Sequence, residues 1–314
     1  MNDPFLTFDE LRNAYLRYLD SPFRLRYPAL MEERRKLLDQ DRQLYREPLF
    51  EPIVPYESSG MTVRSACCQL GAPQQVAEYV ESGGLFPAGR ELFQHQFDAW
   101  QASRSGKAVV VTTGTGSGKT ECYLLPVFAS LVEESAGWSA PSPRAARALW
   151  WNYRKQQRIP QRAHDTGRTK ALRALFLYPL NALIEDQLGR IRRACDSPSG
   201  REWLSKKRDG NRFWFGRYTG STPVSGPQAN DTKRKDLKRR LQNMESEWSQ
   251  AQRSAARSGN DEILSYFQDP QGSEMWSRWD MQEDPPDILI TNYSMLNIVL
   301  MRSLESTLFE QTKN

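Results

Sequence analysis

Cysteine and histidine are scarce in this chain of 314 residues, which has four cysteines and two histidines. Cys67 and Cys68 are adjacent, Cys122 and Cys195 stand alone, and no CxxC pair is present. This pattern argues against a zinc or iron–sulfur site within the chain and against a disulfide scaffold. It favours a reducing compartment.

Long apolar runs are also missing. The first residues, MNDPFLTFDELR, carry acids where a signal peptide needs a basic and then an apolar segment, and no apolar run approaches the length that spans a membrane. We therefore expect a cytoplasmic protein. Its 39% hydrophobic content is enough for a buried core.

Acidic residues are sparse in two stretches, although the net charge is only +5. Nine lysines and arginines lie between Arg144 and Arg173 against the single acid Asp165, and the run KRKDLKRR at 233–240 carries six basic residues against one acid. Such clusters suit a polyanion, because each neutralised phosphate releases counterions. A solvated helix face explains the charge pattern equally well.

The composition and the spacing of apolar residues change along the chain. Residues 1–59 are polar with helical spacing of apolar residues, which predicts a helical accessory region, and residues 60–84 are interpreted as a linker and lead-in. Residues 85–314 predict an α/β domain. Within it, 139–169 and 231–280 are expected to be insertions, the second as a projecting helix or helical pair.

Alternating strand and helix signals predict a parallel sheet of the RecA-like P-loop type. The segment KAVVVTT is interpreted as a short buried strand, and SGKTECYLLPVFASLVEE as the helix after it. Three more strands are expected at 171–178, 213–218 and 286–291. Six tryptophans lie near basic residues, and we expect them to pack in the core rather than stack on bases: Trp150, Trp151, Trp203, Trp214, Trp276 and Trp279.

Between that strand and that helix stands TTGTGSGKTE, residues 112–121. Glycines that open a helix let backbone N–H groups approach phosphate oxygens closely. Lys119 is expected to reach the β- and γ-phosphates of ATP, and the Thr120 hydroxyl to ligate Mg²⁺. The pattern departs from GxxxxGK[ST] because Thr113 occupies the first glycine position. The expected phosphate-binding residues are Thr113, Gly114, Thr115, Gly116, Ser117, Gly118, Lys119 and Thr120.

Four further motifs stand in order around this loop: LFQHQFDAW before it, and YPLNALIEDQ, YTGSTP and PPDILITNYSMLN after it. Together they resemble the Q motif and the backbone-contacting motifs of superfamily 2 DEAD/DEAH-box helicases, in particular the large prokaryotic branch that occurs in anti-phage defence systems. The resemblance implies that the Gln96 amide pairs with adenine and that Phe93 or Phe86 stacks on the base. It assigns nucleic-acid contacts to Pro179, Asn181, Gln187, Gly220, Thr291 and Asn292.

Phosphoryl transfer also needs a carboxylate that holds Mg²⁺ and a second that orients the attacking water. No D-E-x-H or D-E-A-D follows a hydrophobic strand here, and the S-A-T and Q-x-x-G-R-x-x-R motifs are missing as well. We therefore expect the N-terminal portion of a motor, ended one strand before motif II. The isolated chain is predicted to bind ATP weakly and to lack useful turnover.

Three hypotheses follow. The first is part of an ATP-dependent helicase or translocase that grips single-stranded or duplex DNA, with DNA favoured over RNA by the resemblance alone. The second is a nucleotide- and nucleic-acid-binding module that docks on a partner supplying motif II and the second RecA-like domain. The third, a small P-loop kinase, would make the ordered nucleic-acid motifs a coincidence.

Overall fold

The structure is a computed structural model. It describes residues 3–22, 25–40, 42–49, 55–145, 148–153, 157–310 and 312, and the chain divides into a small unit, Met1–Pro55, and a large unit, Tyr56–Asn314. Among the described residues, no helix has the length and apolar character needed to cross a membrane.

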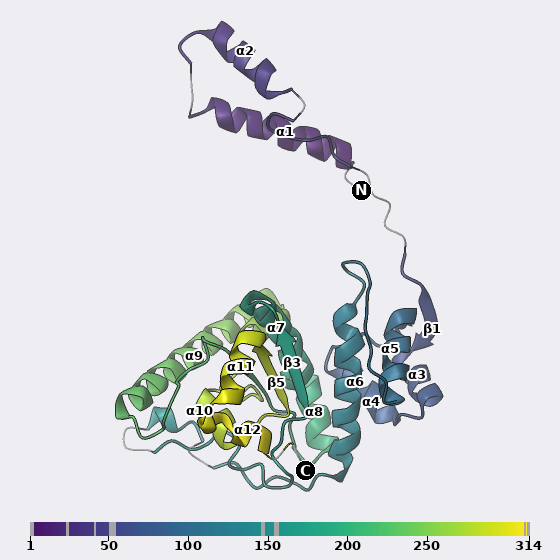
Figure 1. Cartoon of the computed structure of the whole chain (residues 1–314), viewed down its shortest axis with the longest axis vertical. Helices are drawn as coiled ribbons and strands as arrows, with labels where there is room; N and C mark the ends of the chain where they lie inside the picture. Colours follow the sequence, from purple (N-terminus) through teal and green to yellow (C-terminus); the bar gives the residue numbers. More distant parts are fainter. Residues whose placement is uncertain are drawn as a thin grey trace. The chain divides into compact units, whose positions relative to one another are not determined.

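The small unit contains two helices, α1 (Pro4–Asp20) and α2 (Pro28–Leu38), drawn in purple and blue in Figure 1. Each begins with proline at its first helical position, where the missing N–H costs nothing. Asp3 caps α1 by accepting a hydrogen bond from the Phe5 amide at 2.9 Å. The helical spacing predicted for this region is therefore confirmed.

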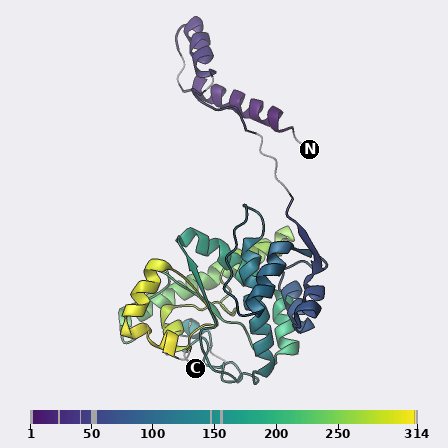
Figure 2. The same ribbon diagram turned by 45° about the vertical axis from the view of Figure 1, so that its right-hand side comes forward.

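The large unit opens with two short antiparallel strands, β1 (Ser58–Thr62) and β2 (Glu91–Phe93). Between them α3 (Val63–Leu70) and α4 (Gln74–Ser82) occupy the range that was expected to be a linker, and they bury Val63, Val76 and Tyr79. Helix α5 (Gln94–Arg104) then packs beside α6 (Lys119–Glu134), the helix that follows the glycine-rich loop (Figures 1 and 2).

A parallel sheet forms the second half of the core, in the order β3 (Ala174–Tyr178), β5 (Ile288–Asn292), β4 (Phe215–Tyr218). The register pairs Tyr178 with Asn292 and Tyr218 with Thr291, so the three strands end together. Strand β5 lies in the middle and is buried along Ile288–Thr291, as a central parallel strand requires. Each strand lies in a segment where the sequence predicted one, and the predicted α/β fold class is confirmed.

Helix α7 (Asn181–Asp196) follows β3 directly and packs against β3 and β5. Helix α9 (Asp231–Ser258) is one long helix of 28 residues that buries Leu237, Leu241, Ala251 and Ala255 rather than projecting into solvent. The other helical elements are α8 (Pro198–Lys207), α10 (Arg278–Glu283), α11 (Tyr293–Met301), α12 (Thr307–Glu310), η1 (Ser135–Gly137), η2 (Trp150–Asn152), η3 (Asp261–Tyr266) and η4 (Ser303–Glu305).

The strand predicted at KAVVVTT is wrong. Residues 107–113 form no strand, and the side chains of Val109 and Val110 are 41% and 88% exposed. Strand geometry is stable only when neighbouring strands satisfy its backbone groups. Within the described residues, the parallel sheet consists of β3, β5 and β4, and none of these strands pairs with this segment.

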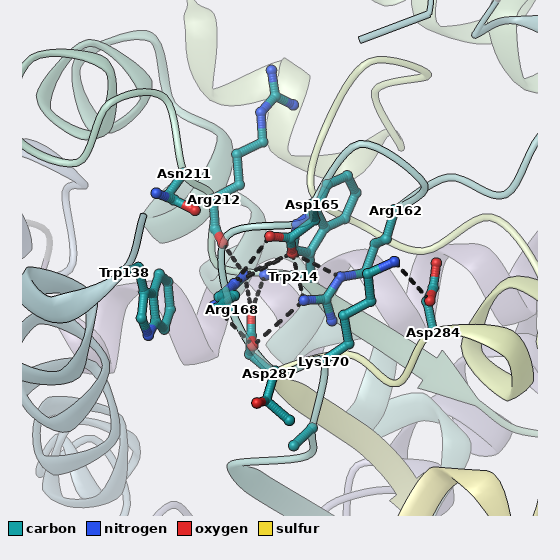
Figure 3. Close-up of polar contacts among 12 residues, drawn as sticks. Trp138, Arg162, Asp165, Arg168, Lys170, Asn211, Arg212, Trp214, Asp284 and Asp287 are labelled. Carbon is teal, nitrogen blue, oxygen red and sulfur yellow. Dashed lines mark hydrogen bonds and ion pairs between the residues drawn. The ribbon is translucent and has the colours of Figure 1, made fainter. Parts of the chain in front are cut away.

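The expected insertion at 139–169 is folded into the domain by ion pairs (Figure 3). Asp287, at the start of β5, is fully buried and accepts hydrogen bonds from Arg168 at 2.9 and 3.1 Å and from Arg173 at 2.9 Å. Asp165 accepts from Arg162 at 2.6 Å and from Arg168 at 3.2 Å. Several basic side chains of this stretch thus form ion pairs inside the domain. Neither the polyanion-binding interpretation nor the solvated-helix interpretation of the charge predicted this.

The predicted packing of the tryptophans is confirmed. All six side chains named above are between 0 and 8% exposed. Trp151 meets Trp276 edge to face with ring centroids 4.7 Å apart, and both belong to an apolar cluster with Leu237 and Leu241 of α9. These rings anchor the insertion and α9 to each other, so they are not available to stack on bases.

Candidate functional site

The glycine-rich loop is held in a tight conformation at the start of α6. Gly118 has φ +73° and Gly116 has φ +77°, values that side chains other than hydrogen rarely allow. A Cβ on Gly118 would lie 2.3 Å from Nε2 of Gln96, so the position also lacks room for one. The loop therefore needs glycine for its backbone shape and for its packing.

Hydrogen bonds from neighbouring elements fix the loop. The Gln96 amide donates to the Gly118 carbonyl at 3.1 Å and accepts from the Phe93 amide at 3.0 Å. Nε2 of His95 lies 2.8 Å from the Ser117 carbonyl, and the Tyr56 hydroxyl donates to the Thr115 carbonyl at 3.2 Å. Within the loop, the hydroxyls of Thr113 and Ser117 are 2.6 Å apart.

A cavity of about 300 Å³ lies against this loop. Three cations line it, Arg90, Lys119 and Arg190, together with the single acid Glu121, so the lining carries an excess of two positive charges. The Lys119 ammonium donates to the carbonyls of Thr113 and Gly114 at 2.6 and 2.9 Å. The lining residues are Leu85, Phe86, Arg90, Gln96, Thr115, Gly116, Ser117, Gly118, Lys119, Thr120, Glu121 and Arg190.

The lining includes most of the predicted nucleotide residues. Thr113, Gly114 and Phe93 are the ones outside it. Phe93 instead stacks on His95 with ring centroids 5.7 Å apart and meets Tyr56 edge to face. Phe86, the second aromatic residue that the sequence offered for the base, does line the cavity.

Sequence reasoning missed Arg90, Glu121 and Arg190. Arg190 Nη1 pairs with Glu121 Oε1 at 2.7 Å, and the second carboxylate oxygen of Glu121 is buried without a hydrogen-bond partner among the described residues. Glu121 follows the lysine–threonine pair directly, so its position is a usable signal. Arg190 lies nine residues into α7, and only tertiary packing brings it here.

Cys122, next to this pair, is an inert thiol. Burial, followed by the charge of Glu121, raises the pKa of Cys122 to about 11. A thiol with such a pKa is almost entirely protonated at neutral pH and is a poor nucleophile.

The predicted nucleic-acid residues divide into two groups. Pro179, Asn181 and Gly220 are exposed at the carboxyl ends of β3 and β4, and Asn292 ends β5 and donates to Asn181 Oδ1 at 2.8 Å. In contrast, Thr291 is 2% exposed and its hydroxyl donates to the Tyr218 carbonyl, while Gln187 is 9% exposed and donates to Asp186. The structure therefore leaves four of the six residues accessible at this edge of the sheet, while Thr291 is buried there and Gln187 is buried on α7.

Two contacts join this edge to the glycine-rich loop. The hydroxyls of Tyr178, at the end of β3, and Tyr123, on α6, are 2.8 Å apart. Burial, and then the hydrogen bond with Tyr123, raises the pKa of Tyr178, so its hydroxyl stays protonated. The Arg190–Glu121 pair is the second contact, because α7 begins at the sheet edge and reaches the cavity nine residues later.

Residues 93–212 match the DEAD/DEAH box helicase family. The matched segment is less than half of the chain. It contains the glycine-rich loop, α6, β3 and α7, so the match covers the loop, most of the cavity and the start of the sheet edge.

Two curated relatives of the chain extend the comparison. Druantia protein DruE of Escherichia coli (strain UMEA 4076-1) is 29% identical over 346 residues, which span 98% of this chain and 17% of that protein. The uncharacterized ATP-dependent helicase YprA of Bacillus subtilis (strain 168) is 26% identical over 124 residues, 40% of this chain and 12% of that protein. The chain thus spans less than a fifth of the length of either relative.

Two solved structures of the DUF1998 helicase MrfA also match, one bound to DNA and one bound to DNA and AMPPNP. Their sequence identities to this chain are 19% and 18%, and both TM-scores are 0.38. The matches cover 76% and 82% of this chain and 20% and 21% of the MrfA chains.

Proposed function

We propose that this chain is the ATP-binding, nucleic-acid-gripping N-terminal portion of an ATP-dependent DNA helicase or translocase in the cytoplasm. The cationic cavity at the Gly118 loop is the observation that carries the proposal. It combines glycines at positive φ, the Lys119 ammonium and an excess of positive charge, which together suit a triphosphate. The similarity to Druantia protein DruE over nearly the whole chain supports a defence-associated parent protein.

The residues fit ATP with Mg²⁺ as the bound group. Lys119 would exchange the Thr113 and Gly114 carbonyls for phosphate oxygens, and Thr120 would supply a hydroxyl ligand to the metal. Gln96 keeps a free hydrogen on Nε2 and a free lone pair on Oε1 after its two hydrogen bonds, so it can both brace the loop and meet an adenine edge. Bound ATP supplies the phosphoryl group whose transfer drives the motor.

A binding experiment on the intact chain tests the nucleotide site. We expect Lys119→Ala to weaken the binding of a fluorescent ATP analogue by about 10- to 100-fold, because a hydrogen bond to a charged group contributes about 1.5–3 kcal/mol. Lys107→Ala is the matched control, since Lys107 is exposed at the other end of the same segment and does not line the cavity. Equal affinities of the two variants would refute the assignment.

The sheet edge is proposed to hold the sugar–phosphate backbone. Asn181 and Gly220 are exposed there, and the first amides of α7 lack a side-chain cap. We expect Asn181→Ala to weaken the binding of single-stranded DNA several-fold and equally for all sequences, with Asn297→Ala on α11 as the control. Parallel titrations with RNA and duplex DNA of the same sequence show which polymer is preferred.

A second candidate function is a module that docks on a partner supplying motif II and the second RecA-like domain. The outer edge of β3 favours it, because within the described residues β3 pairs with β5 alone. Leu175 and Leu177 on that strand are 37% and 46% exposed. A further strand added there would cover these side chains and could carry the missing carboxylates.

Turnover measurements test the incomplete catalytic site that both candidates share. We expect no DNA-stimulated ATP hydrolysis by this chain alone, because the cavity offers Glu121 as its one acid within the described residues. Adding the remainder of the parent protein on a separate chain should restore hydrolysis, and Lys119→Ala should abolish the restored rate. Clear DNA-stimulated turnover by the isolated chain would refute the incomplete-site argument.

A further inference from the structure

Among the described arginines of the inserted segment, one has no acidic side chain as an ion-pair partner. Arg158 pairs with Asp280 at 2.6 Å, Lys170 with Asp284 at 2.9 Å, and the other described arginines of the segment with Asp165 or Asp287. Arg144 is the exception. Its Nε and Nη2 atoms are buried and have no hydrogen-bond partner within the described part of the chain.

These two nitrogens form one side of the guanidinium fork. An Nε–H and the adjacent Nη–H point in parallel, and that pair matches the two oxygens of a carboxylate or phosphoryl group. Burying these two nitrogens without a hydrogen-bond acceptor costs free energy, and a bound anion would offset that cost. The acids nearby are already engaged, because Arg201 pairs with both Asp196 and Asp269.

Two small cavities meet at Arg144. One has a volume of about 240 Å³ and is lined also by Asn152, Tyr153 and Gln271, and the other, about 190 Å³, is lined also by Ser142, His164 and Trp276. Cavities for drug-sized ligands start at about 300 Å³, so each of these suits an anionic group with a few waters rather than a whole nucleotide.

Charge around Arg144 favours an anion as well. Arg212 raises the local positive potential, and burial together with that charge lowers the pKa of Arg144 to about 10, which still leaves it protonated at neutral pH. Arg144 and Arg212, together with Arg201 and its two partners Asp196 and Asp269, leave an excess of one positive charge, the difference between three and two.

We propose that Arg144 anchors a second anion site, which binds a single oxyanion group of the carboxylate or phosphoryl class through its Nε–Nη2 pair. The site lies in the connection from α6 to the start of β3, at the amino end of the parallel sheet. The Gly118 loop and the sheet edge described above lie elsewhere in the domain. The proposal therefore stands independently of ATP and nucleic-acid binding.

Thermal unfolding of the intact chain tests the site, with inorganic phosphate and acetate as separate probes against chloride at constant ionic strength. The measurements use a Lys119→Ala background, so that phosphate at the Gly118 loop does not contribute. We expect at least one probe to raise the unfolding midpoint by about 2–4 °C at saturation. Adding Arg144→Met should abolish that rise, and the probe that acts identifies the oxyanion.

The unfolding midpoints measured in chloride alone, without phosphate or acetate, test the proposal independently. In chloride alone, Arg144→Met should be at least as stable as the parent chain, because it removes an unpaired buried charge. Arg158→Met is the matched control, and it should lower the midpoint because it leaves Asp280 without its partner. Arg144→Lys, which keeps the charge without the fork, should fold normally and show a weaker response to the probe.

Three results would overturn the proposal. These are no stabilisation by either probe in the Lys119→Ala background, stabilisation that persists in Arg144→Met, and a loss of stability in Arg144→Met as large as that in Arg158→Met.

Discussion

The buried carboxylate of Asp287 should hold the inserted segment to the sheet more strongly than any surface ion pair does. It accepts four hydrogen bonds of 2.7 to 3.1 Å, two from Arg168, one from Arg173 and one from the backbone amide of Trp214. Asp287→Asn keeps the volume but removes the charge and one acceptor oxygen. Both guanidinium groups then lose their shared anion.

The loss of stability expected for Asp287→Asn follows from the burial of its carboxylate. Breaking a buried ion pair by removing one partner costs about 3–5 kcal/mol. Asp236 on α9 offers the comparison, because it also meets two arginines, Arg239 at 2.6 Å and Arg240 at 2.9 Å, but in an exposed position. Solvent screens ion pairs at the protein surface, so Asp236→Asn should cost far less stability than Asp287→Asn.

Urea unfolding, followed by the fluorescence of the buried tryptophans, measures both variants. We expect Asp287→Asn to lower the midpoint by about 1–2 M, for a denaturant slope near 3 kcal/mol/M. A double-mutant cycle with Arg168→Met separates the coupling between the two side chains from general damage to the core. A loss no larger than that of Asp236→Asn, or a coupling energy near zero, would refute the reasoning.

Three further predictions concern groups around the two candidate sites. Burial, and then the charge of Arg144, lowers the pKa of His164 to about 4, so the unfolded state binds the proton more readily than the folded state. The free energy of unfolding should therefore fall as the pH drops from about 6.5 to about 4. His164→Gln should flatten that part of the stability–pH profile. Gly118→Ala should weaken ATP binding at least tenfold while Gly137→Ala does not, as fluorescence titration will show, because a methyl group at Gly118 would meet the Gln96 amide and Gly137 has open space. Arg190→Gln breaks the Arg190–Glu121 ion pair between α7 and α6. It should therefore reduce the effect of bound ATP on the affinity for single-stranded DNA, and the reverse, while each affinity measured alone stays within a few-fold. Titrations of each ligand with and without the other measure this coupling.

Local patterns in the sequence were enough to predict the strands of the parallel sheet and the helix after the glycine-rich loop, but not α3 and α4, whose range was interpreted as a linker. Phe176, Phe215 and Ile290 are buried within the apolar runs of these strands, and the apolar pattern of each run is the signal that predicted a strand. The run at Val109 and Val110 has the same composition, yet a strand needs a neighbour, and composition does not say whether one is present.

The candidate site also has a part that the sequence predicts and a part that only tertiary packing reveals. The glycine-rich loop is contiguous in the sequence, and every residue from Thr115 to Thr120 lines the cavity. Arg190 joins that cavity from 70 residues further along, and Arg158 pairs with Asp280, which lies 122 residues after it. Charge counted along the chain indicates an excess, but it cannot show which acid meets which base.

The open edge of β3 also has a consequence for handling the protein. Within the described residues one edge of β3 has no neighbouring strand, and such an edge is a template for pairing with a second chain. Leu175 and Leu177 are exposed on this strand, and Ala174–Tyr178 contains no lysine or proline that would discourage such pairing. Expressed alone, this chain should self-associate through β3 as its concentration rises. Leu177→Lys should keep it monomeric. Keeping the isolated domain in solution therefore depends on blocking strand pairing at β3 more than on increasing the stability of its core.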